Sequence, residues 1–225
     1  MSKFLKHDVV SKILEVGLIP TFYNGDIEVA KKIIQACVNS GAEVVEFTNR
    51  GYFAHRIFSE IAKWFSKEHP EAILGIGTVF DPATASLYIN NGANFVLGPV
   101  LNPEIFKICN RRKVSYIPGC STPSEISAAE EMGADIIKIF PANVLGYGFI
   151  KSVLGPSPWS KLMPSGGVKA TREDIFAWIK AGASVLNIGS TLIRKDLVKA
   201  KDFEGIAKIT EQCILWIKEA RETSG

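Results

Sequence analysis

The sequence has few cysteines, and they lie far apart. The four are Cys37, Cys109, Cys120 and Cys213, in a chain of 225 residues with no C-x-x-C pair. This spacing is typical neither of a zinc site nor of a disulfide framework. We therefore expect free, mostly buried thiols and a cytoplasmic location.

Long apolar runs and blocks of one charge are also missing. No stretch approaches the roughly 20 apolar residues that span a bilayer, and charges occupy the N-terminal segment where a signal peptide needs its apolar run. The 26 Lys and Arg residues exceed the 23 Asp and Glu residues by three and are spread along the chain. We expect no membrane or nucleic-acid partner, although a mild positive charge helps to attract an anionic substrate.

Motifs for metals and nucleotides are absent as well. The three histidines, His7, His55 and His69, have neither H-x-x-x-H spacing nor nearby carboxylates at ligand spacing. The sequence contains no P-loop and no G-x-S-x-G elbow. We expect no metal and no cofactor.

A recurring Gly-Ala pair indicates the fold. The pair ends a helical stretch and precedes a β-rich run at Gly41, Gly92, Gly133 and Gly182. Glycine ends helices in the left-handed conformation because it has no Cβ to clash. Each pair therefore predicts a junction from helix to strand.

Together with the runs between them, these junctions predict eight strands. The predicted strands are Leu18–Phe22, Glu43–Phe47, Ala72–Ile76, Asn94–Leu97, Val114–Ile117, Asp135–Phe140, Lys161–Pro164 and Ser184–Ile188. The predicted helices between them are Asp26–Asn39, Tyr52–Lys67, Pro82–Asn91, Pro103–Asn110, Pro123–Met132 and Arg172–Lys180, with further helices at Asp8–Val16 and Phe203–Glu222. Strict alternation predicts a parallel sheet, and eight units close a barrel. We expect one α/β domain over residues 1–225, a (β/α)₈ TIM barrel with an extra N-terminal helix. The alternative is an open doubly wound sheet, although no G-x-G-x-x-G turn follows the first strand.

Lys138 is the most informative polar residue within a predicted strand. It lies between Ile137 and Ile139, and side chains alternate between the faces of a strand. If the isoleucines pack on the helices, Lys138 points into the barrel with Ile136 and Phe140. Burial disfavours the charged form of an amine, and a neutral amine can attack a carbonyl. The sequence alone leaves open a lysine that reaches solvent or pairs with a carboxylate.

Glu46 occupies a similar position in the second predicted strand. It shares a face with Val44 and Thr48, so its carboxylate can pair with Lys138 or move protons through a water. Arg50 follows in the loop, and its guanidinium suits a substrate carboxylate. A merely solvated Arg50 and a structural Glu46–Lys138 ion pair remain open interpretations.

Small residues follow three other strands. Gly75-Ile-Gly-Thr78 ends the third strand, where Thr78 offers a hydroxyl. Pro164-Ser-Gly-Gly167 and Ile188-Gly-Ser-Thr191 follow the seventh and eighth. Loops after the last two strands of a barrel frequently bind phosphate through backbone N–H groups. We therefore expect an anion site there.

These motifs, in this order, make the chain resemble the 2-keto-3-deoxy-6-phosphogluconate aldolase family, from about Val10 to Ala220. The segments that carry the resemblance are Glu46-Phe-Thr-Asn-Arg50, Gly75-Ile-Gly-Thr-Val79, Ile117-Pro-Gly119, Lys138-Ile-Phe-Pro141, Pro164-Ser-Gly-Gly-Val168 and Ile188-Gly-Ser190. Members are class I aldolases, often also active on 4-hydroxy-2-oxoglutarate. The resemblance implies a small 2-keto acid substrate, with a phosphate favoured at its far end, and a homotrimer.

The resemblance also implies a role for each residue. Lys138 matches the Schiff-base lysine and Glu46 the general acid and base. Arg50 and Thr78 match groups that hold the pyruvyl carboxylate. The remaining implied substrate contacts are Pro99, Phe140, Ser165, Gly166, Gly167, Gly189 and Ser190, of which the last four match the phosphate-binding loops. Ser165 stands where the enterobacterial relative has threonine in contact with a substrate hydroxyl, so the preferred epimer stays open.

Two other functions remain as alternatives. A barrel isomerase or epimerase of a phosphosugar would use Glu46 as a base and would release no pyruvate. A non-catalytic barrel that binds a phosphorylated metabolite is less favoured, because a binding protein has no need of an interior lysine nucleophile. The resemblance further suggests that the loop Asn143–Gly148 shapes the substrate end.

Overall fold

The computed structural model describes residues 3–223, in which short parallel strands alternate with helices. The strands are β1 (Leu18–Phe22), β2 (Val44–Thr48), β3 (Ile73–Gly77), β4 (Phe95–Leu97), β5 (Ser115–Ile117), β6 (Gly119–Cys120), β7 (Ile137–Ile139), β8 (Leu162–Pro164) and β9 (Leu186–Ile188). The helices are α1 (Lys6–Val16), α2 (Ile27–Asn39), α3 (Ala54–Glu68), α4 (Pro82–Asn90), α5 (Pro103–Arg112), α6 (Pro123–Glu131), α7 (Ala142–Leu154), α8 (Arg172–Lys180), α9 (Lys195–Ala200) and α10 (Phe203–Glu222).

The Gly-Ala junctions are confirmed. Gly41, Gly92, Gly133 and Gly182 follow α2, α4, α6 and α8 with φ of 94°, 102°, 92° and 105°. This left-handed conformation is strained for residues that carry a Cβ. The repeated pair thus sets where each of these helices ends and where the chain turns toward the next strand.

The predicted helix starts are also confirmed where proline marks them. Pro82, Pro103 and Pro123 occupy the first turns of α4, α5 and α6, directly after the N-cap residues. The cap side chains of Asp81, Asn102 and Thr122 each accept a hydrogen bond from a backbone N–H of that turn. Proline suits this position because it lacks an N–H that would otherwise go unpaired.

One local prediction is wrong, and two elements were not predicted. The fifth predicted strand is confirmed as β5, but β6 after it was not expected. Pro118 separates the two strands because it has no N–H for the ladder, although its carbonyl accepts from Lys138 N at 2.9 Å. The predicted loop 143–148 lies within α7, which is kinked at Gly146 (φ 73°, ψ 175°). Helix α9 was not expected at all.

The strands form two hydrogen-bonded sheets with parallel pairing. One has the order β5-β4-β3-β2-β1-β9 and the other β6-β7-β8. The sheets meet where β5 runs into β6 and where Ser165, after β8, forms an isolated bridge with Asn187 of β9. Strands β1 to β5 lie in sequence order, without the reversal that a doubly wound sheet requires.

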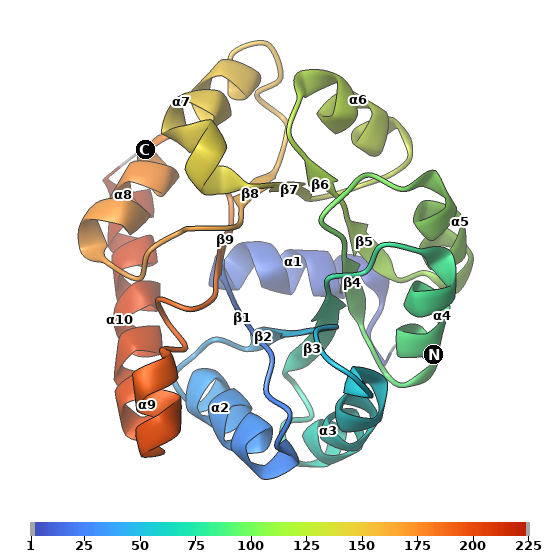
Figure 1. Cartoon of the computed structure of the whole chain (residues 1–225). Coiled ribbons are helices and arrows are strands. Elements are labelled where there is room, and N and C mark those ends of the chain that lie inside the picture. Colours follow the sequence, from blue (N-terminus) through green and yellow to red (C-terminus); the bar gives the residue numbers. More distant parts are fainter. Residues whose placement is uncertain (1–2, 224–225) are drawn as a thin grey trace.

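The side chains of the strands divide between two apolar cores. Val45, Phe47, Ile137 and Ile139 pack in the core between strands and helices. Val44, Ile73, Phe95, Ile136 and Met163 pack in an interior core, which Val9 and Ile13 of α1 complete. Figure 1 shows the helices around the outside of the strands, with α1 crossing behind them. The inward orientation predicted for Ile136 is therefore confirmed, and α1 covers the interior core at one end.

All four cysteines are free and buried. Within residues 3–223, no helix has the length and apolar character that crossing a bilayer requires. The cytoplasmic location stays a prediction.

Candidate active site

A cavity of about 630 Å³ opens at the carboxyl ends of the strands. Its walls come from β1, β2, β7 and β9, from the loops after these strands and after β8, and from α2 and α9. The predicted site residues that line it are Glu46, Arg50, Lys138, Phe140, Ser165, Gly166, Gly167, Gly189 and Ser190. Residues from several separate predicted motifs are thus brought together in one place.

Lys138 lies on β7 between Gly119 of β6 and Met163 of β8. Its side chain is only 6% exposed, and its Nζ lies 5.1 Å from the centroid of the Phe140 ring. Burial lowers the pKa of Lys138; Glu46 opposes this shift by attraction, and Arg50 adds to it by repulsion. The amine therefore loses its proton more readily than a surface lysine, as a nucleophile requires.

Glu46 faces the same cavity from β2 and is 1% exposed. Within residues 3–223, Glu46 and Lys138 form no direct ion pair; they interact through space, and the Glu46 Oε2 atom accepts a hydrogen bond from Asn187 Nδ2 at 2.9 Å. A Cβ on Gly77 of β3 would overlap Glu46 Oε1. Glycine at position 77 therefore leaves room for this carboxylate. The structural ion pair between Glu46 and Lys138 that the sequence left open is not formed.

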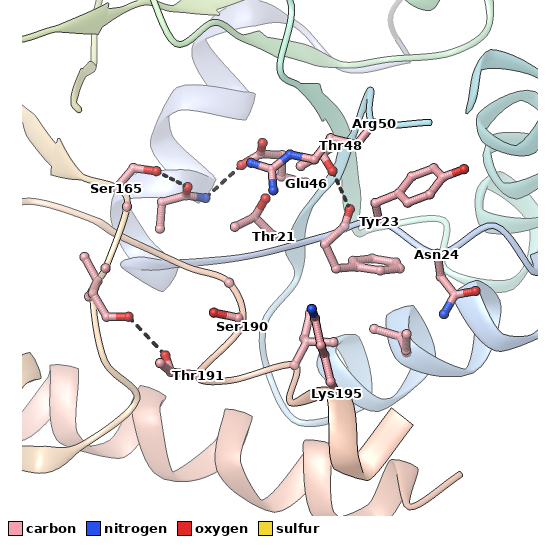
Figure 2. Close-up of a pocket in the computed structure, with 18 of the residues that line it drawn as sticks. Thr21, Tyr23, Asn24, Glu46, Thr48, Arg50, Ser165, Ser190, Thr191 and Lys195 are labelled. Atoms are coloured by element: carbon pink, nitrogen blue, oxygen red, sulfur yellow. Dashed lines mark hydrogen bonds between the residues drawn. The ribbon is translucent and has the colours of Figure 1, made fainter. Parts of the chain in front are cut away.

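Asn187 is a site residue that the sequence reasoning missed. It is 2% exposed on β9, where it accepts from Ser165 Oγ at 2.6 Å and donates to Ile19 O at 3.1 Å. Dashed lines in Figure 2 mark the path of hydrogen bonds from Ser165 to Glu46. The alternation of β9 offered a signal, because Asn187 is the inward polar residue between Leu186 and Ile188.

The two small-residue loops supply backbone donors. In the described part of the chain, the N–H groups of Gly166, Gly167, Gly189 and Ser190 donate to no protein acceptor. Thr191 joins the two loops, since its Oγ1 donates to Val168 O at 3.0 Å and accepts from Ala170 N at 3.1 Å. Several unpaired N–H groups at one end of a cavity suit an anion.

The charges of the cavity lining favour an anionic ligand. Arg50, Lys138, Lys195 and Lys199 are basic, whereas Glu46 is the single acidic residue among the described lining residues. In Figure 2, Glu46 and Arg50 lie toward one end of the cavity, and Ser190, Thr191 and Lys195 toward the other. No sequence signal singled out Lys195 and Lys199, which resemble other surface lysines.

Thr78 and Pro99 are not among the lining residues. Thr78 directly follows β3 and adopts a left-handed φ of 63°, unusual for a β-branched residue. The backbone of Pro99 lies against Gly119, the partner of Lys138 in the ladder. Both residues are close to strands of the site, and their role in substrate binding stays a prediction.

Residues 3–223 contain no group of three or more His, Cys, Asp or Glu side chains placed to hold a metal ion.

Comparisons with known proteins agree with this geometry. A family model described as KDPG and KHG aldolase matches residues 9–209. A KHG/KDPG aldolase of Escherichia coli is 31% identical over 205 residues, which are 90% of this chain and 93% of that protein. A 2-dehydro-3-deoxy-phosphogluconate aldolase of Haemophilus influenzae is 26% identical over 216 residues, or 96% and 99% of the two chains.

A solved structure shares the fold. The KDPG aldolase of Legionella pneumophila, crystallised with pyruvate captured at low pH as a covalent carbinolamine intermediate, superposes with a TM-score of 0.81. The match covers 89% of this chain and 95% of that one at 23% identity.

Proposed function

Because the chain belongs to the KDPG and KHG aldolase family, we propose that it is a class I aldolase in which Lys138 forms a Schiff base with a 2-keto acid. The observation that carries the proposal is a buried lysine with a lowered pKa in a cavity that also holds one carboxylate and unpaired backbone donors. The covalent carbinolamine of pyruvate described for the Legionella enzyme supports Schiff-base chemistry in this family.

The proposed reaction begins at the C2 ketone. Neutral Lys138 Nζ attacks this carbon, and Glu46 moves the protons needed to expel water from the carbinolamine, directly or through a water. The resulting iminium withdraws electrons as the C3–C4 bond breaks, while Glu46 takes the proton of the C4 hydroxyl. Glu46 returns a proton to C3 of the enamine, and hydrolysis releases pyruvate and restores Lys138. The iminium nitrogen accepts the electrons, so the proposed route uses no metal.

The cavity fits a substrate with anions at both ends. Arg50 and the loops at Gly166 and Ser190 line the cavity, and we propose that Arg50 binds the carboxylate next to C2 and that the two loops bind a distal phosphate. We propose cleavage of 2-keto-3-deoxy-6-phosphogluconate to pyruvate and glyceraldehyde 3-phosphate, or of 4-hydroxy-2-oxoglutarate to pyruvate and glyoxylate. The name of the Escherichia coli relative includes both substrates, whereas that of the Haemophilus influenzae relative includes only the phosphogluconate. Cleavage of the 6-phosphogalactonate epimer is the alternative.

Pyruvate release tests the activity. Each substrate is supplied to the wild-type protein, to Lys138→Met and to the surface control Lys180→Met, with lactate dehydrogenase reporting pyruvate. We expect turnover by the wild type and the control, none by Lys138→Met, and no loss after EDTA treatment. Interconversion of sugar phosphates without pyruvate would instead favour the isomerase, and stabilisation by ligand without turnover would favour the binding protein.

We also propose that the nine strands of residues 3–223 close into one barrel and that the chain is a single domain. The proposal is supported by the continuous chain from β5 to β6, by the Ser165–Asn187 bridge, and by an interior core whose residues come from most of the strands and the segments just before them. A single cooperative unfolding transition is expected, and two separate transitions would contradict a single domain.

We propose a homotrimer, as the family resemblance implies, and exposed apolar side chains support an interface between subunits. Tyr52 and Phe53 follow β2, Phe80 follows β3 and Val100 follows β4, with exposed fractions of 94%, 62%, 55% and 40%. Large apolar groups gathered after neighbouring strands are typical of an interface.

A further inference from the structure

The buried amide of Asn187 makes hydrogen bonds to three different parts of the site. Its Nδ2 donates to Ile19 O at 3.1 Å and to Glu46 Oε2 at 2.9 Å, while its Oδ1 accepts from Ser165 Oγ at 2.6 Å. Both protons of the amide nitrogen are thus used, and the carbonyl oxygen receives a donor. Exchanging the nitrogen and oxygen would place an oxygen against the carbonyl of Ile19 and the carboxylate of Glu46. The amide therefore has one satisfied orientation.

This orientation determines what the Ser165 hydroxyl offers to a ligand. A hydroxyl has a single proton, and Asn187 Oδ1 accepts it. The lone pairs of Ser165 Oγ remain for the cavity, which Ser165 lines. Ser165 is therefore set as an acceptor, and it suits a substrate hydroxyl that donates.

The same amide also determines where the Glu46 carboxylate lies. Gly77 leaves the space that Oε1 occupies, and Asn187 binds Oε2. Asn187 therefore holds the Glu46 carboxylate inside the cavity, where it can take a proton from the substrate.

We propose that Asn187 is a positioning residue that holds Glu46 as the proton acceptor for the C4 hydroxyl and Ser165 as an acceptor for a neighbouring substrate hydroxyl. One amide thus couples proton transfer to the orientation of the substrate, on which selection of the C4 configuration depends. This inference rests on the proposed aldolase function. It goes beyond that function because Asn187 itself need not touch the substrate.

Exchange of the C3 protons of pyruvate in deuterium oxide isolates the Glu46 half of the proposal. This exchange requires the Lys138 imine and a base but no aldehyde, and NMR follows it directly. Replacing Asn187 by leucine removes one hydrogen bond to a carboxylate, for which we expect exchange to slow about 10- to 100-fold. The imine on Lys138 should still form and be trapped by borohydride.

The nearly isosteric variant Asn187→Asp gives a readout that a purely structural role would not change. Its introduced carboxyl can donate to Glu46 only when protonated. The ratio of the wild-type to the variant exchange rate should therefore fall as the solution is taken from about pH 8 to about pH 5. A ratio that stays constant over this range would overturn the proposed donation to Glu46.

Epimer selection tests the Ser165 half. In Asn187→Leu the Ser165 hydroxyl regains its rotation, so the ratio of kcat/KM between the phosphogluconate and phosphogalactonate epimers should move toward one. An unchanged ratio would contradict the coupling.

Asn94→Leu is the matched control. Asn94 is also buried and donates a hydrogen bond to Leu74 O at 3.1 Å, but it lies just before β4, at the end of the strands away from the cavity. We expect this variant to lower the melting temperature while folded protein exchanges pyruvate protons at the wild-type rate. If Asn94→Leu slows exchange as much as Asn187→Leu does, the effect is general and the inference is wrong. If the wild type itself neither exchanges pyruvate protons nor forms an adduct, the aldolase proposal fails first.

Discussion

Adding a single methyl group at Gly77 should impair catalysis by displacing Glu46. A Cβ on this residue would overlap Glu46 Oε1, while the other carboxylate oxygen accepts from Asn187 at 2.9 Å. In Gly77→Ala the carboxylate must rotate away and give up that bond. A hydrogen bond to a charged group contributes about 1.5–3 kcal/mol, which corresponds to a factor of about 10–150. We expect kcat to fall within this range, which lies below most of the roughly 10²- to 10⁴-fold loss for a missing general base.

The matched control is Gly75→Ala on the same inner face of β3. A Cβ there would meet the ring of Phe95 in the interior core rather than Glu46. Overpacking of this kind costs about 1–3 kcal/mol of stability. Both variants should therefore melt at lower temperature, but only Gly77→Ala should lose activity per folded molecule.

The assay combines pyruvate release with the folded fraction measured by circular dichroism at the assay temperature. Borohydride trapping of Gly77→Ala with pyruvate should still modify Lys138, because the amine is untouched. Wild-type kcat per folded molecule in Gly77→Ala would refute the claim that the observed carboxylate position is needed. Equal losses in both variants would point to general disruption of the fold.

Three further outcomes are expected. Burial lowers the pKa of Lys138 below its ordinary 10.5, so the cost of burying its charge is fully present below the folded-state pKa and is lost as the pH rises to 10.5. Lys138→Met should therefore stabilise the protein at low pH, by about 1.4 kcal/mol for every pH unit between the folded-state and unfolded-state pKa. Urea unfolding measures this stabilisation, and a value that does not shrink toward alkaline pH would contradict the prediction. Lys195→Ala should raise KM up to about fivefold for a phosphorylated substrate, because an exposed ion pair contributes up to about 1 kcal/mol. KM for 4-hydroxy-2-oxoglutarate should stay unchanged, and equal changes in the two KM values would show that Lys195 does not bind the phosphate. Tyr52→Glu should shift the sedimentation coefficient from trimer toward monomer, whereas an unchanged value would place the interface elsewhere.

Local rules predicted most of the elements, because the signals are local. The left-handed glycines and the prolines of the first helical turns act within a few residues, so the ends of α2, α4 and α6 follow from the sequence. Alternation on β2 and β7 is equally local, and it placed Glu46 and Lys138 on the inner face.

The missed features depend on contacts between distant segments. The short strand β6 after Pro118 is defined by its pairing with β7, whereas β5 before Pro118 pairs with β4. The segment 143–148 lies within α7, with non-helical dihedral angles only at Gly146. Lys195 becomes a cavity residue because α9 follows β9 closely, which no property of a lysine-rich segment reveals. Asn187 shows the same alternation as Lys138, but an amide among apolar residues is a weaker sequence signal than a charge.

The central claim is that Lys138 forms the covalent intermediate, and reduction of the pyruvate adduct tests it most directly. The protein is treated with borohydride in the presence of pyruvate, digested and mapped by mass spectrometry, with Lys138→Met carried in parallel. We predict one stoichiometric reduced adduct, located on Lys138 and absent from the variant. No adduct on Lys138, or an adduct on another lysine that persists in Lys138→Met, would contradict the claim.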